Sequence, residues 1–165
     1  MEAAVIVLSK IELNEDTSHL PTTEVEQQRF SFYFKDQTTD LYNQQYLNII
    51  LKRNQLNYEF KCLNIIFMHN FSQYNEKHGW QGGDELLKKF ASIIKNEFPS
   101  GLIFRLHGDD FIVINKDHTD INIEKLESLC ELKKDHITLT NMYFHIKNDE
   151  INNIEELENH LLTQA

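Results

Sequence analysis

The chain has 165 residues, of which 41% are hydrophobic and 11 are Phe, which is enough apolar material for the core of one domain. Its formal net charge of -10 at pH 7 argues against non-specific binding of DNA or RNA, because such binding needs a surplus of Lys and Arg. No apolar run approaches the length of a membrane-spanning helix, and Cys62 and Cys130 lack metal-site spacing, so we expect a cytoplasmic protein with buried free thiols, no nucleic-acid partner and no membrane segment in this chain.

Residues 1–35 are predicted to form a lead-in to the main domain. Residues 3–8 have the apolar, β-branched composition of a short strand. Thr23 and Glu26 have the spacing of a capping box, which predicts that a connecting helix begins after Thr23. We expect this strand and helix to precede a single domain over residues 36–165.

The hydrophobic pattern of residues 36–165 alternates between helices and strands. The expected elements are a helix from residue 41, a strand over 62–68, a short helix over 71–77, an amphipathic helix from residue 84, a β-hairpin over 102–114, a helix over 123–132, a strand over 136–146 and a helix over 154–162. Glycines at positions 79, 82 and 83 predict a loop between the two central helices. One hairpin among several helices indicates an α+β fold in which helices flank a mainly antiparallel central sheet.

The predicted hairpin has an unusual tip. Its two apolar runs flank the corner His107-Gly108-Asp109, where Gly108 supplies the backbone freedom that a tight turn needs. Asp109 and Asp110 are adjacent carboxylates that repel each other, so such a pair usually lies where a cation or a ligand uses it. The simpler interpretation is a solvated acidic turn.

Three segments resemble, in order, three motifs of the GGDEF domain, the fold of diguanylate cyclases. Residues 36–43 (DQTTDLYN) are similar to Asp-x-Leu-Thr-Gly-Leu-x-Asn, and residues 70–79 (NFSQYNEKHG) to the segment Asp-x-Phe-Lys-x-Ile-Asn-Asp-x-x-Gly. Residues 105–111 (RLHGDDF) are similar to the hairpin signature Arg-x-Gly-Gly-(Asp/Glu)-Glu-Phe. The resemblance extends from residue 36 to residue 162 and implies the palm-like α+β domain of this family and of related nucleotide cyclases.

The resemblance also implies a chemistry. In the family, the 3′-hydroxyl of one GTP attacks the α-phosphate of another to make cyclic di-GMP, with Mg²⁺ held by carboxylates and one nucleotide held by each subunit of a dimer. Asp109 and Asp110 stand at the catalytic positions of the hairpin tip. Asp109 also stands at the position of one of the family's metal ligands. Asn75, Asp84 and Gly108 stand at nucleotide-binding positions. Asp84 also fits a first-turn acid that interacts with the dipole of the helix predicted from residue 84.

Several family positions carry other residues. The second metal carboxylate position is Phe67, which cannot bind a metal, and a further family Asp aligns with His69. The phosphate-facing Lys is Ser72, and the first Gly of the hairpin signature is His107. The family's motif for feedback binding of cyclic di-GMP falls on residues 98–101 (FPSG), so we expect no such binding. The closing Ala-Lys-x-x-Gly-Arg segment is absent, so we expect the domain to lack its C-terminal end.

Two main hypotheses follow from these matches and departures. The first is a degenerate, non-catalytic GGDEF-type regulatory domain in bacterial cyclic-di-GMP-related signalling, which binds GTP weakly or mediates dimerisation, as a homodimer or with a partner signalling domain. The second is an active diguanylate cyclase with an altered metal site built on Asp109 and Asp110. No cofactor follows from the first hypothesis, whereas Mg²⁺ would be required for any activity that remains.

A third hypothesis is a transition-metal site made by His69, His107 and Asp109, because imidazole and carboxylate together favour Zn²⁺ or a similar ion over Mg²⁺. Its alternative is that both histidines are ordinary polar residues at the edge of the sheet. Trp80 and Phe71 are predicted to be packing residues, because isolated aromatic side chains near helix starts usually fill the edge of a core.

Overall fold

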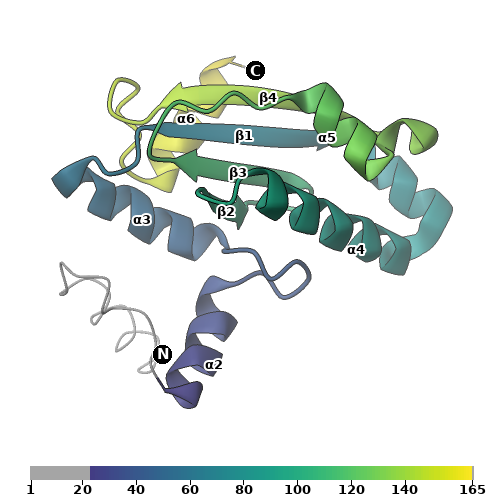
Figure 1. The fold of residues 1–165 in the computed structure, drawn as a ribbon, viewed down its shortest axis with the longest axis horizontal. Helices are drawn as coiled ribbons and strands as arrows, with labels where there is room; N and C mark the ends of the chain where they lie inside the picture. Colours follow the sequence, from purple (N-terminus) through teal and green to yellow (C-terminus); the bar gives the residue numbers. More distant parts are fainter. Residues whose placement is uncertain (1–22, 165) are drawn as a thin grey trace.

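A four-stranded antiparallel sheet lies between two layers of helices in the computed structural model, which describes residues 23–164 (Figure 1). The sheet has the order β2-β3-β1-β4, and its strands are β1 (Cys62–His69), β2 (Leu102–Arg105), β3 (Asp110–Asn115) and β4 (Thr138–His145). Strand β1 pairs antiparallel with β3 and β4, and β2 pairs antiparallel with β3. The predicted α+β fold is thereby confirmed, while the strand predicted over residues 3–8 lies outside the described residues.

The helices cover both faces of this sheet. They are α2 (Glu24–Phe34), α3 (Gln44–Asn57), α4 (Phe71–Glu97), α5 (Ile123–Cys130) and α6 (Ile154–Gln164), with a short 3₁₀ helix, η2 (Leu132–Asp135), after α5. Helices α3 and α6 pack on one face of the sheet, and α4 and α5 on the other (Figure 1). None of the helices within residues 23–164 is both long and apolar enough to cross a membrane.

Strand β1 contributes to both halves of the core. Leu63 and Ile65 pack with the helices α3 and α6, whereas Ile66 and Met68 pack with α4 and α5. This alternation follows from the two-residue period of a strand, and because both faces are covered, β1 is mostly apolar in sequence, with Asn64 as a buried polar exception. Burial of each such side chain stabilises the fold by about 1.5–3 kcal/mol.

The connecting helix α2 begins at the predicted capping box. The Thr23 side chain accepts a hydrogen bond from the backbone of Glu26, whose side chain accepts one from the Thr23 backbone. Phe30 and Phe34 of α2 are buried against Tyr46 of α3, with ring centroids 5.3 and 5.7 Å from that of Tyr46. Aromatic packing therefore joins α2 to the helical layer on its side of the sheet.

Helix α4 differs from the prediction of two helices separated by a glycine-containing loop. It runs from Phe71 to Glu97, and only Gly79 leaves the helical conformation, with φ 76° and ψ 168°. Gly82 and Gly83 are helical, although each Gly disfavours a helix by about 1 kcal/mol relative to Ala. The buried apolar face of the second half outweighs this penalty. Asp84 therefore lies beyond the first turn of the segment that follows Gly79, and the prediction of a first-turn acid was wrong.

Candidate functional site

The hairpin between β2 and β3 has the predicted tight tip. The Leu106 backbone N–H donates to the carbonyl of Asp110 at 2.9 Å, and the Asp110 N–H donates to the carbonyl of His107 at 2.7 Å. Gly108 has a φ of +46°, a left-handed conformation that glycine adopts without strain. The Arg105 Nε donates to the carbonyl of Gly108 at 2.7 Å, which fixes the tip from within the hairpin.

A cavity of about 680 Å³ lies beside this tip. It is bounded by the C-terminal end of β1, the first half of α4 and the hairpin. Its lining comprises Met68, His69, Asn70, Phe71, Ser72, Asn75, Glu76, Trp80, Gly108 and Asp109. The structure thus brings together His69, Asn75, Gly108 and Asp109, four of the residues predicted as candidates for the site. Asp110, Asp84 and His107, also predicted, do not line this cavity.

Asn75 is held closely against the second half of α4. A Cβ atom added at Gly83 would lie only 1.8 Å from the Asn75 Oδ1, so a glycine is needed here for this close approach. The Oδ1 is buried and has no hydrogen-bond partner within the described part of the chain. Asp84, the neighbour of Gly83, is exposed. A buried acceptor without a donor is uncommon in folded proteins and marks Asn75 as a functional candidate.

Asp110 lies directly opposite Phe67 on the neighbouring strand. These two residues are Cα partners in the β1–β3 ladder, so their side chains lie on the same face of the sheet. Burial, followed by repulsion from Asp109, raises the pKa of Asp110 to about 6, although His107 and His69 partly oppose this rise. The two adjacent carboxylates therefore occupy different environments, because Asp109 borders the cavity whereas Asp110 lies opposite Phe67 in the ladder and does not line the cavity.

The two histidines near the hairpin have different neighbours. The Nε2 of His69 lies 2.8 Å from the Thr140 hydroxyl on β4, and the Nε2 of His107 lies 3.7 Å from a carboxylate oxygen of Glu158 on α6. Within residues 23–164, no group of three or more His, Cys, Asp or Glu side chains is arranged to hold a metal ion. The structure thus does not assemble His69, His107 and Asp109 into the hypothesised transition-metal site.

The two aromatic residues predicted to pack behave differently. Phe71 is buried, with 9% of its surface exposed, and its prediction is confirmed. Trp80 has 82% of its surface exposed and borders the cavity, so its prediction as a packing residue was wrong. Its position directly after Gly79, where the helix is interrupted, is the sequence signal that could have indicated this, because a break changes which side chains of a helix face the core.

The comparison with known families now decides what kind of domain this is. The family model described as "Diguanylate cyclase, GGDEF domain" matches residues 33–152, which is more than half of the chain. The chain belongs to the GGDEF domain family. Diguanylate cyclase DgcS from Shewanella oneidensis is 35% identical to it over 101 residues, which are 58% of this chain and 33% of that protein. The chain spans about a third of the length of the curated relatives it matches.

Solved structures of GGDEF proteins share the fold of this chain. The coiled coil and GGDEF domain of DgcB from Caulobacter crescentus, solved in complex with c-di-GMP, has a TM-score of 0.58 and 21% identity, covering 86% of this chain and 81% of that one. Diguanylate cyclase SiaD from Pseudomonas aeruginosa, solved with its activator SiaC, has a TM-score of 0.55 and 16% identity, covering 86% of this chain and 61% of that one. At these identities the likeness shows the fold alone.

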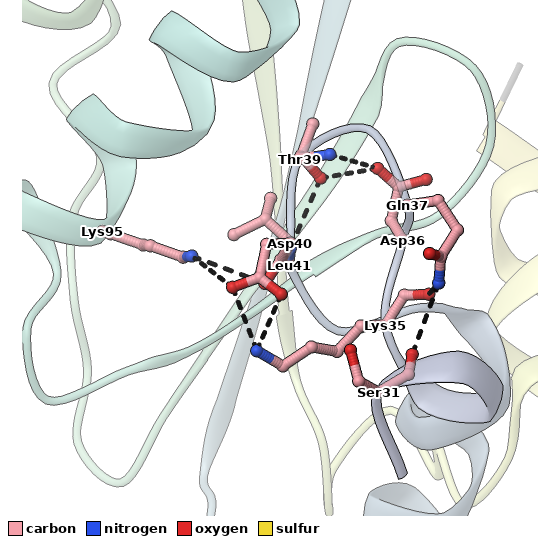
Figure 2. Close-up of polar contacts among 8 residues, drawn as sticks. All are labelled: Ser31, Lys35, Asp36, Gln37, Thr39, Asp40, Leu41 and Lys95. Atoms are coloured by element: carbon pink, nitrogen blue, oxygen red, sulfur yellow. Dashed lines mark hydrogen bonds and ion pairs between the residues drawn. The ribbon is translucent and has the colours of Figure 1, made fainter. Parts of the chain in front are cut away.

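The opening motif of this GGDEF domain forms a tight loop that contacts the hairpin. The Asp36 Oδ1 accepts hydrogen bonds from the Thr39 N–H and hydroxyl, at 2.8 and 2.7 Å, and from the Arg105 Nη1 at 2.9 Å. Asp40 accepts from Lys35 at 2.9 Å, and Lys95 of α4 donates to the Asp40 carbonyl at 3.4 Å (Figure 2). The loop therefore connects the end of α2 with both the hairpin and α4.

Electrostatics favours the charged form of Asp36 in this loop. Its partial burial would by itself raise its pKa, but hydrogen bonds from Thr39 and Arg105 outweigh burial and hold the pKa below its usual value. Arg105 donates to both Asp36 and the Gly108 carbonyl, so one side chain joins the loop to the hairpin tip. This connection was not predicted from the sequence, although Asp36 and Arg105 both lie in the motifs that resemble the family.

Proposed function

We propose that this chain is a degenerate, non-catalytic GGDEF-type regulatory domain in bacterial cyclic-di-GMP-related signalling. The observation that carries this proposal is the pairing of Phe67 with Asp110 across β1 and β3. The family resemblance places a metal carboxylate at the position of Phe67, and a phenyl ring offers no oxygen ligand to Mg²⁺. The residues present therefore do not fit the metal site that the cyclase reaction would need.

The expected effect of this replacement on catalysis is large. In phosphoryl transfer the metal supplies several kcal/mol of transition-state stabilisation, and each 1.4 kcal/mol corresponds to about a tenfold change in rate. The remaining carboxylates, Asp109 and Asp110, point to different surroundings, and Asp110 has a pKa of about 6.

The phosphate-binding side of the site also departs from the family pattern. Ser72 lines the cavity at the position of the family's phosphate-facing Lys. A hydroxyl group can donate one hydrogen bond to a phosphate oxygen, but it brings no charge to offset that of a triphosphate. Weak binding of GTP without turnover is therefore the outcome that we expect from these residues.

The regulatory role is supported by helix α2 and its connection to the hairpin. Val25 and Phe32 of α2 have 58% and 71% of their surfaces exposed, so this helix presents apolar side chains to a second copy or to a partner signalling domain. The loop that follows α2 is bonded to the hairpin tip through Asp36 and Arg105. A partner bound to α2 would thus act on an element mechanically linked to the candidate site.

The test is an assay of the full chain with GTP and either Mg²⁺ or Mn²⁺, followed by chromatography for cyclic di-GMP and pyrophosphate. We expect neither product, while an active family cyclase assayed in parallel forms both. Sedimentation velocity of the wild type and of Phe32→Ser tests association through α2. The alternative of an active cyclase is favoured by the survival of Asp109 and Asp110, and multiple turnovers that Asp109→Asn abolishes would establish it in place of our proposal.

A further inference from the structure

Strand β4 lies at one edge of the sheet, and its outer side has no partner strand within residues 23–164 (Figure 1). The opposite edge, β2, is partly covered, because Tyr42 of the loop after α2 forms a bridge to Phe104. The sequence of β4, TLTNMYFH, contains no Asp, Glu, Lys, Arg or Pro, the residues that commonly protect an exposed edge from pairing. The outer side of β4 is therefore available to a further strand.

The ladder between β1 and β4 determines which backbone groups face outward. The Ile146 N–H donates to the Lys61 carbonyl at 2.9 Å, one position beyond the last pair of the β1–β4 register. In an antiparallel ladder the bonded pairs recur at every second residue. The even-numbered residues of β4 therefore bond to β1, and the N–H and C=O groups of Asn141 and Tyr143 face outward.

Two carboxylates agree with this assignment and define the length of the open edge. The Leu139 N–H donates to the Glu127 Oε1 at 2.9 Å, and the His145 N–H donates to the Asp149 Oδ2 at 2.7 Å. The His145 carbonyl accepts from the Asp149 N–H at 2.9 Å. Both ends of the edge are thus occupied within the domain, which leaves an open edge of residues 141–143 centred on Met142.

We propose that this open edge binds an extended peptide that adds antiparallel to β4, with a basic residue opposite Tyr143, an apolar residue opposite Met142 and a small uncharged residue opposite Asn141. The two outer residues of the peptide each exchange a pair of main-chain hydrogen bonds with β4. From its N-terminus, the recognised sequence is of the type Arg-Ile-Thr. This inference goes beyond the proposed function, because residues 141–143 do not line the cavity.

The surroundings of Tyr143 assign the basic position. Burial raises the pKa of the Tyr143 phenol, and Cys62, Asp149 and Asp120 raise it further. The negative charges that disfavour a phenolate favour a cation, and the ring, with 39% of its surface exposed, offers a face to Lys or Arg. The net charge of -10 also attracts a basic peptide at longer range.

The side chains beside Tyr143 assign the other two positions. Met142 is half-buried and packs against the core on the side of α3 and α6, so an apolar side chain opposite it extends this surface. Asn141 is exposed on the other face, and its Nδ2 donates to the Asn64 Oδ1 at 3.2 Å. A Thr opposite Asn141 can bond to this amide, and its β-branched side chain favours an extended backbone.

The experiment measures amide hydrogen exchange of the full chain by NMR, alone and with the peptide acetyl-Ser-Arg-Ile-Thr-Ser-amide. The amides of Asn141 and Tyr143 should exchange rapidly in the free protein and about tenfold or more slowly with saturating peptide. The amides of Thr140 and Met142, which bond to β1, should be protected throughout. Protection of Asn141 and Tyr143 without peptide would overturn the inference, and an increase of that protection with protein concentration would assign the edge to a second copy instead.

Modified peptides, measured by calorimetry, separate pairing at the edge from general attraction. Methylation of the Arg or the Thr nitrogen of the peptide should weaken binding about tenfold, because each of these N–H groups bonds to β4. Methylation of the Ile nitrogen, which faces away from β4, should change the affinity by less than about twofold. Replacement of Arg by Glu should weaken binding about tenfold through repulsion from Asp120 and Asp149. If the peptides bind alike, or none binds, the inference fails.

A pair of protein variants tests the assigned position of the basic residue. Tyr143→Ser should weaken binding of the unmodified peptide about fivefold, because it removes the ring that the Arg side chain covers. Tyr58→Ser is the matched control, since Tyr58 has 41% of its surface exposed and lies at the C-terminal end of α3. Circular dichroism verifies that both variants are folded. Equal affinity of the two variants would place the peptide away from Tyr143 and contradict the inference.

Discussion

Arg105 on β2 donates a hydrogen bond to Asp36, 69 residues earlier in the chain, and thereby joins the loop after α2 to the hairpin of the candidate site. The Nη1–Oδ1 distance is 2.9 Å, and the side chains are only 14% and 24% exposed. The same guanidinium donates to the carbonyl of Gly108. The position of the hairpin tip therefore depends on a contact with the segment that leads in from α2.

Removal of this pair should destabilise the domain. We expect Arg105→Met or Asp36→Asn to lower the free energy of unfolding by about 1–3 kcal/mol, because each leaves a partly buried group without its partner. Urea unfolding at pH 7 measures the change. A double-mutant cycle of both substitutions should give a coupling energy of about 1–2 kcal/mol, and a coupling within error of zero would contradict the link.

The same pair makes a prediction about acid. The pKa of Asp36 is lowered in the folded state, so its charge stabilises the fold above the unfolded pKa of about 3.9, and this contribution is lost as the pH falls through the folded pKa. The wild type should therefore lose stability below about pH 4 more steeply than Asp36→Asn. Unfolding curves of both proteins between pH 3 and pH 7 test this, and parallel curves would show that the pair contributes nothing.

Asp110 should show the opposite dependence on pH. Its pKa rises from 3.8 to about 6 on folding, so the protonated carboxyl stabilises the fold fully below about pH 4, and this stabilisation is lost as the pH rises through about 6. The full shift corresponds to about 3 kcal/mol, which the partial exposure of the group reduces to about 1–2 kcal/mol. Asp110→Asn should therefore gain stability relative to the wild type between pH 4 and pH 7.

The measurement is the free energy of unfolding of Asp110→Asn and wild type at several pH values in that interval. Glu124→Gln serves as the control, because the side chain of Glu124 is exposed. A stability difference between Asp110→Asn and the wild type that does not change with pH would mean that Asp110 is ionised as freely in the folded state as in the unfolded chain.

Restoring a carboxylate on β1 should create cation binding. In Phe67→Asp the new side chain would face Asp110 on the same side of the sheet, close to the hairpin tip. We expect this variant to bind Mn²⁺ at least about tenfold more tightly than the wild type, because the new carboxylate adds oxygen ligands next to Asp110. It should also be less stable without metal, through lost packing of Phe67 and repulsion between carboxylates.

Isothermal titration with Mn²⁺ and thermal unfolding with and without the ion provide the readouts. Phe67→Asn is the matched control, since it has the same size as the Asp variant and lacks the charge. If the two variants bind Mn²⁺ equally, Phe67 does not occupy the position that completes a metal site.

The close approach of Asn75 to Gly83 predicts a change of sign in a double substitution. Gly83→Ala should destabilise the wild type by about 1 kcal/mol, because the clash with Asn75 outweighs the better helix propensity of Ala. In the Asn75→Ala background the same substitution should stabilise the domain by about 0.5–1 kcal/mol. Chemical unfolding of the four proteins measures both effects. An equal effect in both backgrounds would show that the amide does not occupy this space.

Several elements could be predicted from the sequence because neighbouring residues determine them. The capping box of Thr23 and Glu26 and the hairpin around Gly108 depend on residues only a few positions apart. The division of the β1 side chains between the two halves of the core follows from strand geometry once both faces are apolar. The family resemblance likewise depends on motifs in local order, and so does the presence of Asn75 and Asp109 among the residues of the site.

Other features were decided only by the tertiary structure. Packing of the apolar face of α4 on the sheet keeps Gly82 and Gly83 helical, while the interruption at Gly79 leaves Trp80 exposed at the cavity. The bond between Asp36 and Arg105 requires two segments that the sheet and helices bring together. Local propensities amount to about 1 kcal/mol per residue, so contacts between distant residues, which bury larger surfaces and pair charges, determine the outcome where the two disagree.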